Sequence, residues 1–171
     1  MTVPFSTIRG FPPIADRRAR VLVLGSMPSE ASLAAREYYA HRHNQFWRIM
    51  GAICGFDRAA PYARRQAALK AARIALWDVV WSCRRPGSLD SAIVEDSIRV
   101  NDFAAFLRAH PAITCVCFNG RRAESAWRRY VVRSLPPARK LEYRLLPSTS
   151  PAHAGMSYLR KLRTWEDAIR C

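Results

Sequence analysis

The stretch RVLVLGSMPS, residues 20–29, decides the fold. Residues 20–25 form an almost uninterrupted apolar run that ends at a glycine, which is typical of a strand buried on both faces. Similar runs occur at residues 74–80, 113–118 and 142–147. Helical apolar spacing lies between and after them, at residues 44–54, 60–72, 101–110, 120–132 and 157–170. Because apolar strands alternate with helices, we predict an α/β fold, a three-layer α/β/α sandwich around a central four-stranded, mainly parallel sheet.

The length and composition predict one folded domain over residues 1–171. Half of the residues are hydrophobic, so the chain can bury a core, and no linker or repeat divides it. No apolar run approaches the roughly 18 residues of a membrane span. The N-terminal MTVPFSTIRGFPPIADRRAR lacks the apolar segment of a secretory signal. We therefore expect a cytoplasmic protein that does not bind membranes and acts as a monomer.

The net charge of +15 is large for this length, and arginine supplies nearly all of it, since the only lysines are Lys70, Lys140 and Lys161. Arginine guanidinium groups match phosphate oxygens, so the charge is consistent with nucleic acid as the partner. Codon bias and solubility would explain the same charge. Composition alone leaves the two explanations open.

The five cysteines are an odd number in mostly apolar surroundings, and we interpret them as reduced packing residues: Cys54, Cys83, Cys115, Cys117 and Cys171. Cys115 and Cys117 would share one face of a strand, but no second pair has the spacing of metal ligands. We therefore expect no metal and no cofactor.

Polar motifs follow all four predicted strands. GSMPS (25–29), Asp78, FNG (118–120) and PSTSPAH (147–153) each come at the end of a strand or just beyond it. Ligands bind at the carboxyl ends of parallel strands. The four motifs are therefore expected to form one site.

The order of these motifs resembles the uracil-DNA glycosylase superfamily. GSMPS, YYAHRHNQFW (38–47) and LPSTSPAHAG (146–155) carry the resemblance, which covers residues 18–168 and is closest to the sixth family, the hypoxanthine-DNA glycosylases. LWDVVWSC, GSLDSAI and FNGRRAE fit the same pattern. The resemblance implies a monofunctional glycosylase that flips a deaminated base, with hypoxanthine as first choice, out of DNA and hydrolyses its glycosidic bond. The alternatives are a uracil glycosylase for double-stranded or mismatched DNA and a catalytically weak DNA-binding relative.

The resemblance also assigns the loop after the last strand to the DNA backbone. The hydroxyls of Ser148, Thr149 and Ser150 are expected to bind phosphate, and the two prolines to stiffen the loop. The wedge that fills the gap in the base stack falls at Ala152 or His153, and the larger His153 is preferred. A purely structural turn is the alternative. The DNA-binding residues are thus predicted to be Pro147, Ser148, Thr149, Ser150, Pro151, Ala152 and His153.

The third position of the first motif is a departure, because Met27 stands where many relatives carry a water-activating Asp or Asn. A thioether cannot polarise water, so the resemblance points to Asn44 as the residue that orients it. An amide has little basicity, which suits a dissociative cleavage. Asn44 also reads as a helix N-cap, and the two roles are compatible.

Base binding is assigned to Phe46 for stacking and to backbone amides of Ser26, Met27 and Ser29. Phe46 as a core residue is the alternative. Asp78 is expected to read the base edge as a hydrogen-bond acceptor, and an ion pair with arginine is its alternative. Asp90, Asn101 and Asp102 either support the site residues or cap helices, and caps are preferred; Asn119 is predicted as an N-cap rather than a ligand. For His41 and His43, phosphate contact and plain surface are equally open.

Overall fold

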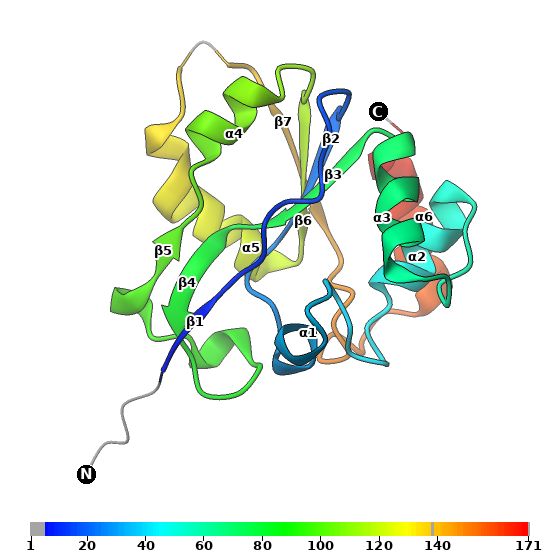
Figure 1. The fold of residues 1–171 in the computed structure, drawn as a ribbon, viewed down its shortest axis with the longest axis horizontal. Helices are drawn as coiled ribbons and strands as arrows, with labels where there is room; N and C mark the ends of the chain where they lie inside the picture. Colours follow the sequence, from blue (N-terminus) through cyan, green and yellow to red (C-terminus); the bar gives the residue numbers. More distant parts are fainter. Residues whose placement is uncertain (1–5, 138, 171) are drawn as a thin grey trace.

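The computed structural model describes residues 6–137 and 139–170, and its centre is a four-stranded parallel sheet with strand order β3-β2-β6-β7 (Figure 1). The strands are β2 (Val21–Gly25), β3 (Ile74–Asp78), β6 (Cys115–Asn119) and β7 (Glu142–Leu146). The register pairs Gly25 of β2 with Asp78 of β3, so the two chain positions that begin the polar motifs are neighbours. The predicted sheet is therefore confirmed, with strand ends shifted by one or two residues.

Helices cover both faces of this sheet, as the sandwich prediction requires (Figure 1). One layer contains α2 (Phe46–Cys54), α3 (Tyr62–Ala71) and α6 (Tyr158–Ile169). The other contains α4 (Phe103–Ala109) and α5 (Arg121–Ala126), which continues as a π-helical turn over Trp127–Val131 and a 3₁₀ turn over Val132–Ser134. None of the helices in the described residues is both long and apolar enough to cross a membrane.

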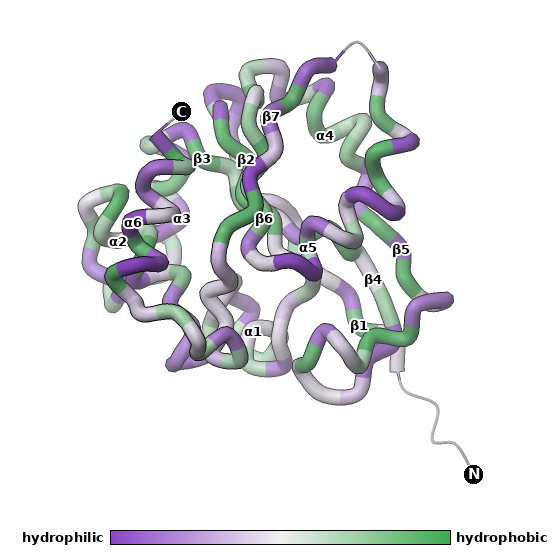
Figure 2. The backbone as a smooth tube through the Cα atoms, turned by 180° about the vertical axis from the view of Figure 1, so that it is seen from behind, coloured by the Kyte–Doolittle hydropathy of each residue, from purple (hydrophilic) through white to green (hydrophobic). Residues whose placement is uncertain are grey.

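The core explains why the strand sequences lack alternation. Every residue of β2 and β3 is buried, because side chains on both faces meet a helical layer. Figure 2 shows apolar residues along the central strands and more polar colours in the loops at their carboxyl ends. The sheet is thus a rigid platform with polar loops along one edge.

A second, antiparallel sheet was not predicted. It has the order β1-β4-β5, with β1 (Thr7–Arg9), β4 (Val80–Arg84) and β5 (Arg99–Val100). The predicted strand 74–80 ends at Asp78, and the chain then passes into β4 of the small sheet. Asn101 stabilises the bend with two hydrogen bonds. Its Nδ2 donates to the backbone carbonyl of Asp78 (2.8 Å), and its backbone N–H donates to the backbone carbonyl of Val79 (3.1 Å).

Short elements complete the carboxyl edge. Helix α1 (Glu30–Ala35) follows the first motif, with Ser29 as an N-cap that accepts from the backbone N–H of Ser32 at 3.2 Å. Two 3₁₀ turns, Asp90–Ala92 and Glu95–Ser97, lie between β4 and β5. Cys115 and Cys117 are both buried in β6, and their sulfur atoms lie 3.8 Å apart on one face of the strand. The role of Cys171 lies outside the described residues.

Candidate active site

A cavity of about 310 Å³ lies at the carboxyl edge of the large sheet, where the four polar motifs meet. Its volume is at the small end of the range of about 300–1,000 Å³ for ligand sites. Most of the residues that the sequence assigned to the site line it: Ser26, Met27, Asn44, Asp78, Ser148, Thr149, Ser150, Ala152 and His153. Phe46, Pro147 and Pro151 do not.

Gly25 lies beneath two polar side chains at the floor of the cavity. A Cβ atom there would lie 2.3 Å from Oδ1 of Asp78 and 2.8 Å from the hydroxyl of Tyr39. Both distances are far below van der Waals contact, so only glycine leaves room for these groups. The glycine that ends β2 is therefore part of the site as well as the end of a strand.

The carboxyl group of Asp78 is buried, and the charge of Arg85 only partly offsets the cost of that burial. The residue is 3% exposed, and its Oδ2 has no hydrogen-bond partner among the described residues. Desolvation, with the nearby charge of Asp90, raises the pKa of Asp78 to about 8. Among the described residues Asp78 forms no ion pair with an arginine, and its raised pKa favours the neutral carboxyl, which can donate as well as accept. Its reading of the base edge stays a prediction.

Asn44 lies at the start of α2, and its side chain lines the cavity. Its Oδ1 accepts the backbone N–H of Phe46 at 2.9 Å, so the predicted capping bond is present, although Gln45 occupies the cap position of the helix. The Gln45 backbone N–H donates to the Thr149 carbonyl at 3.0 Å. This bond joins the Asn44 motif to the loop after β7.

The stacking assignment of Phe46 requires correction. Phe46 is completely buried in the core, where it stacks on Tyr39 with ring centroids 4.1 Å apart and an interplanar angle of 25°. Tyr39 itself lines the cavity, and its backbone has a φ of 54°, the left-handed region that a bulky residue rarely adopts. The aromatic residues that line the cavity are therefore Tyr38 and Tyr39, and only Tyr39 stacks on Phe46. The Tyr-Tyr pair before Ala40 was the signal in the sequence that marked them.

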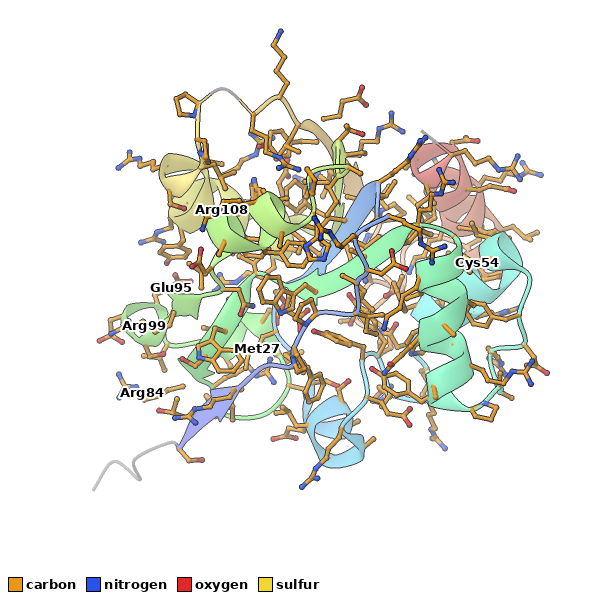
Figure 3. The ribbon with its side chains drawn as sticks, turned by 45° about the horizontal axis from the view of Figure 1, so that its top comes forward. Met27, Cys54, Arg84, Glu95, Arg99 and Arg108 are labelled. Carbon is orange, nitrogen blue, oxygen red and sulfur yellow. The ribbon has the colours of Figure 1, made fainter. Side chains whose placement is uncertain are left out.

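Met27 contributes no side chain to the chemistry. It is 7% exposed and packs with Val80, Cys83 and Ile93 in a small core beneath the antiparallel sheet. Figure 3 shows it on the side of the molecule where β1 and β4 lie. The residue at the position where relatives carry Asp or Asn thus packs in this small core, and it is also one of the residues that line the cavity.

The loop after β7 is fixed from within. The Asn119 side chain bonds Thr149 twice, donating to its hydroxyl and accepting its backbone N–H, each at 2.9 Å. Thr149 is completely buried, so its hydroxyl is not available to phosphate, and that part of the prediction was wrong. The hydroxyls of Ser148 and Ser150 accept backbone N–H groups of the loop itself, at 3.2 and 3.3 Å. Each can still donate its proton outward.

Helix α6 holds the same loop at both ends. Trp165 donates from its indole N–H to the Pro147 carbonyl at 3.0 Å, and Lys161 donates from Nζ to the His153 carbonyl at 2.7 Å. Lys161 is 2% exposed, and burial lowers its pKa. The exposed end of the loop, Ala152 and His153, therefore projects from a rigid base.

Two predicted caps are site residues instead. Asp90 lines the cavity and accepts a hydrogen bond from the Ser26 hydroxyl, and Asn119 lines it beside Thr149. Asn101 holds the bend after β3. Asp102 alone is a cap as predicted, accepting the Ala105 backbone N–H at 2.9 Å.

The histidines His41 and His43 are exposed, and phosphate binding by them stays a prediction. Among the described residues, no three His, Cys, Asp or Glu side chains come together in a group that could hold a metal.

Known proteins resemble the chain over nearly its full length. The family model of the uracil DNA glycosylase superfamily matches residues 12–169. A hypoxanthine DNA glycosylase of Methanosarcina acetivorans is 36% identical over 163 residues, covering 95% of this chain and 98% of that protein. One of Methanosarcina barkeri is 38% identical over 116 residues, 67% of this chain and 72% of that protein.

A solved structure has the same fold. The solution NMR structure of a Methanosarcina acetivorans protein, described as a candidate uracil DNA glycosylase, matches with a TM-score of 0.79 at 33% identity, covering 96% of this chain and 98% of that one. The fold, the cavity where the motifs meet and the match over residues 12–169 together show that the chain belongs to the uracil DNA glycosylase superfamily.

Proposed function

We propose that the protein is a monofunctional DNA glycosylase that draws a deaminated base, hypoxanthine foremost, from DNA into the cavity and hydrolyses its glycosidic bond. The observation that carries the proposal is the buried Asp78 carboxyl, whose Oδ2 has no partner among the described residues and whose raised pKa favours the neutral form, in a small cavity lined also by the loop 147–153. The relatives named hypoxanthine DNA glycosylase support the same choice of base.

A neutral carboxyl matches the edge of hypoxanthine. Its carbonyl oxygen accepts the ring N1–H while its O–H donates to the adjacent O6, so one side chain forms two parallel hydrogen bonds. Burial makes both bonds matter, because an unpaired polar group in this position costs about 1–3 kcal/mol. The Tyr39 ring, backed by Phe46, is the surface on which the flipped base stacks.

Hydrolysis needs a water near the sugar carbon, and the residue that places this water need not be the one that accepts its proton. We assign its placement to Asn44, whose amide lines the cavity while α2 fixes its orientation through the bond to the Phe46 backbone N–H. The described lining of the cavity contains no lysine, so a Schiff-base intermediate has no amine there to form it.

DNA binding is assigned to the loop 147–153. Ser148 and Ser150 donate to phosphate, and His153, which is exposed at the rim, fills the gap left by the flipped base. Thr149 is reassigned to the framework of the loop. Because Asn119, Lys161 and Trp165 hold the loop before DNA arrives, little conformational entropy is lost on binding.

Uracil removal is the second candidate, favoured by one observation. The N–H and carbonyl pair that a neutral Asp78 recognises also occurs on uracil and xanthine, so this residue does not choose among them. Cavity shape and the Tyr39 surface then decide the preference.

Duplexes that carry hypoxanthine, uracil or xanthine opposite each normal base test both candidates. Alkaline cleavage after incubation reports base removal. We expect the hypoxanthine duplex to be cleaved fastest and the undamaged duplex not at all. Fastest cleavage of uracil would transfer the assignment to the second candidate. Tight binding without cleavage of any duplex would instead identify a DNA-binding relative without activity.

A further inference from the structure

Asp90 is a second carboxyl at the cavity, close enough to Asp78 for its charge to act on that residue. It begins the 3₁₀ turn Asp90–Ala92, lines the cavity, and has a side chain that is 34% exposed. Its Oδ2 accepts a hydrogen bond from the Ser26 hydroxyl, which also lines the cavity. The proposed function above assigns it no role.

A buried arginine orients this carboxyl. The Arg85 side chain has no exposed surface, and an Nη atom lies 3.7 Å from Oδ1 of Asp90. The same guanidinium donates to the carbonyls of Gly87 and Pro28, at 2.8 and 2.5 Å. One buried charge therefore links the loop after β2 to the loop after β4, which carry Ser26 and Asp90.

The hydrogen bond fixes what Ser26 offers to the cavity. A carboxylate only accepts, so the single hydroxyl proton of Ser26 is held by Asp90, and the lone pairs of its oxygen are left for other donors. A water in the cavity can then donate to Ser26. This pairing provides a path for a proton from the cavity to a carboxylate.

The reaction needs a proton acceptor, and neither Asn44 nor Met27 provides one. Hydrolysis adds water to the sugar C1′, and the water must lose one proton. The Asn44 amide places a water but accepts no proton, and the Met27 side chain packs away from the cavity. A carboxylate reached through a hydroxyl supplies the missing acceptor.

We propose that Asp90, acting through the hydroxyl of Ser26, accepts the proton that the hydrolytic water loses. The bond between the base nitrogen and C1′ breaks, and its electron pair leaves with the base. The water oxygen bonds to C1′ and gives a proton to Ser26 Oγ as the Ser26 proton passes to Asp90. The proton then leaves to solvent and the base anion gains one from solvent, so one water is consumed for each base released. The inference rests on the proposed glycosylase function.

The surroundings of Asp90 determine the pH above which it is ionised and can accept a proton. Burial raises its pKa, while the Ser26 bond and the charges of Arg85 and Arg122 oppose that rise. The other ionisable groups that interact with it are Asp78, Tyr39 and Cys83. The rate should therefore fall on the acid side as Asp90 becomes protonated, and it should do so at a higher pH than an ordinary aspartate would give.

The test measures single-turnover base release from a hypoxanthine duplex across pH. Asp90→Asn keeps an oxygen that accepts from Ser26 but removes the proton acceptor, and Ser26→Ala removes the relay without altering Arg85. Each change should slow release by about a hundredfold, the lower end of the usual contribution of a general base. Asp90→Asn should also lose the acid limb of the pH profile. Because the two groups act in series, the double variant should be no slower than the slower single variant.

Asp96→Asn is the matched control, since Asp96 is a surface carboxylate of the same segment, paired with Arg84. It should release base at the wild-type rate. Thermal melts and affinity for an abasic-site duplex show whether each variant is folded. If Asp90→Asn unfolds, the rate of Ser26→Ala alone tests the relay. A single variant that keeps the wild-type rate and acid limb, or losses that multiply in the double variant, overturns the relay alone. No base release by the wild-type protein overturns the proposed function together with it.

Discussion

At the residue scale, Asn44 has two tasks that one substitution separates. Its Oδ1 caps the backbone N–H of Phe46, and its side chain lines the cavity. Asn44→Ala should slow base release by about a hundredfold or more, as expected for loss of one positioned polar group. Lost capping should lower the free energy of unfolding by only about 0.5–2 kcal/mol.

Single-turnover rates and thermal melts of the Asn44 variant measure the two effects. Affinity for undamaged duplex should hold, because the phosphate contacts lie in another loop. Asn44→Asp, which retains an oxygen for the capping bond, is the companion variant. An alanine variant that releases base at the wild-type rate would move the search for the water-placing group to Ser148.

The rate of base release should depend on pH through the ionisation of Asp78. Burial raises its pKa to about 8, so the neutral form that matches the lactam edge is lost as pH rises through that value. Asp78→Asn keeps one acceptor and one donor but cannot ionise. The variant should therefore retain base release near neutral pH, and its rate should fall less than that of the wild type on going to about pH 9.

Stability should follow the same titration. The folded state retains the Asp78 proton at pH values where the unfolded chain has lost it, so this group makes the fold less stable as pH rises from about 4 to about 8. Asp78→Asn should melt above the wild type at about pH 9 and differ less at about pH 5. Equal pH dependence of both proteins would show that Asp78 is ionised in the cavity.

At the element scale, α6 holds the loop 147–153, to which we assign DNA binding. Lys161 and Trp165 bind the carbonyls of His153 and Pro147 from one helix face. Lys161→Met removes one anchor and keeps an unbranched side chain in the buried position. The Kd for an abasic-site duplex should rise by about tenfold, since a lost hydrogen bond to a charged group is worth about 1.5–3 kcal/mol and part is recovered by water.

The rate at saturating DNA should change less than the affinity, because the Lys161 variant leaves the cavity intact. Lys140→Met is the control, since Lys140 is an exposed lysine outside this loop, and the variant should bind like the wild type. A slower rate at unchanged affinity would mean that the loop acts in the chemical step instead.

The end of β2 offers a steric test. Gly25→Ala would put a methyl group 2.3 Å from Oδ1 of Asp78 and 2.8 Å from the Tyr39 hydroxyl. Both groups must move, so base release should fall at least as far as in Asp78→Leu, a variant that removes the carboxyl altogether. The circular dichroism spectrum of Gly25→Ala should remain that of a folded α/β protein. Wild-type activity of Gly25→Ala would mean that neither group holds the base.

The elements themselves were predictable because burial on both faces dictates long apolar runs. The four strands of the large sheet and their flanking helices appear where the sequence placed them, within about two residues. The break after Asp78 was not predictable, because residues 74–80 are one apolar run and the bend depends on Asn101, a distant partner. The small sheet was missed for the same reason, since its pairing joins segments far apart in the chain.

The sequence predicted which loops form the site, but it did not predict the position of every side chain in them. Motif order brought Asn44, Asp78 and the loop 147–153 to one cavity. Spacing did not reveal that Phe46 faces the core and Tyr39 the cavity, since that depends on the left-handed backbone of Tyr39. Nor did it reveal that the Thr149 hydroxyl is already bound by Asn119 or that Asp90 meets Ser26.

At the scale of the whole molecule, the charge of +15 should govern encounter with DNA. Each phosphate that the protein neutralises releases counterions, so the logarithm of the binding constant should fall linearly with the logarithm of salt concentration. Binding to undamaged duplex between about 50 and 200 mM salt should weaken at least tenfold. Fluorescence anisotropy measures this change in affinity, and a flat response to salt would contradict nucleic acid as the partner of this basic protein.

The central claim is that this cavity hydrolyses the glycosidic bond of a base drawn out of DNA. The most direct measurement follows one hypoxanthine-containing duplex with enzyme in excess, quantifying free hypoxanthine by chromatography and strand integrity before alkali. We expect one free hypoxanthine for each damaged duplex, an intact strand until alkali is added, and loss of this release in Asn44→Ala. Strand cleavage without alkali, or equal release by the wild type and Asn44→Ala, would contradict it.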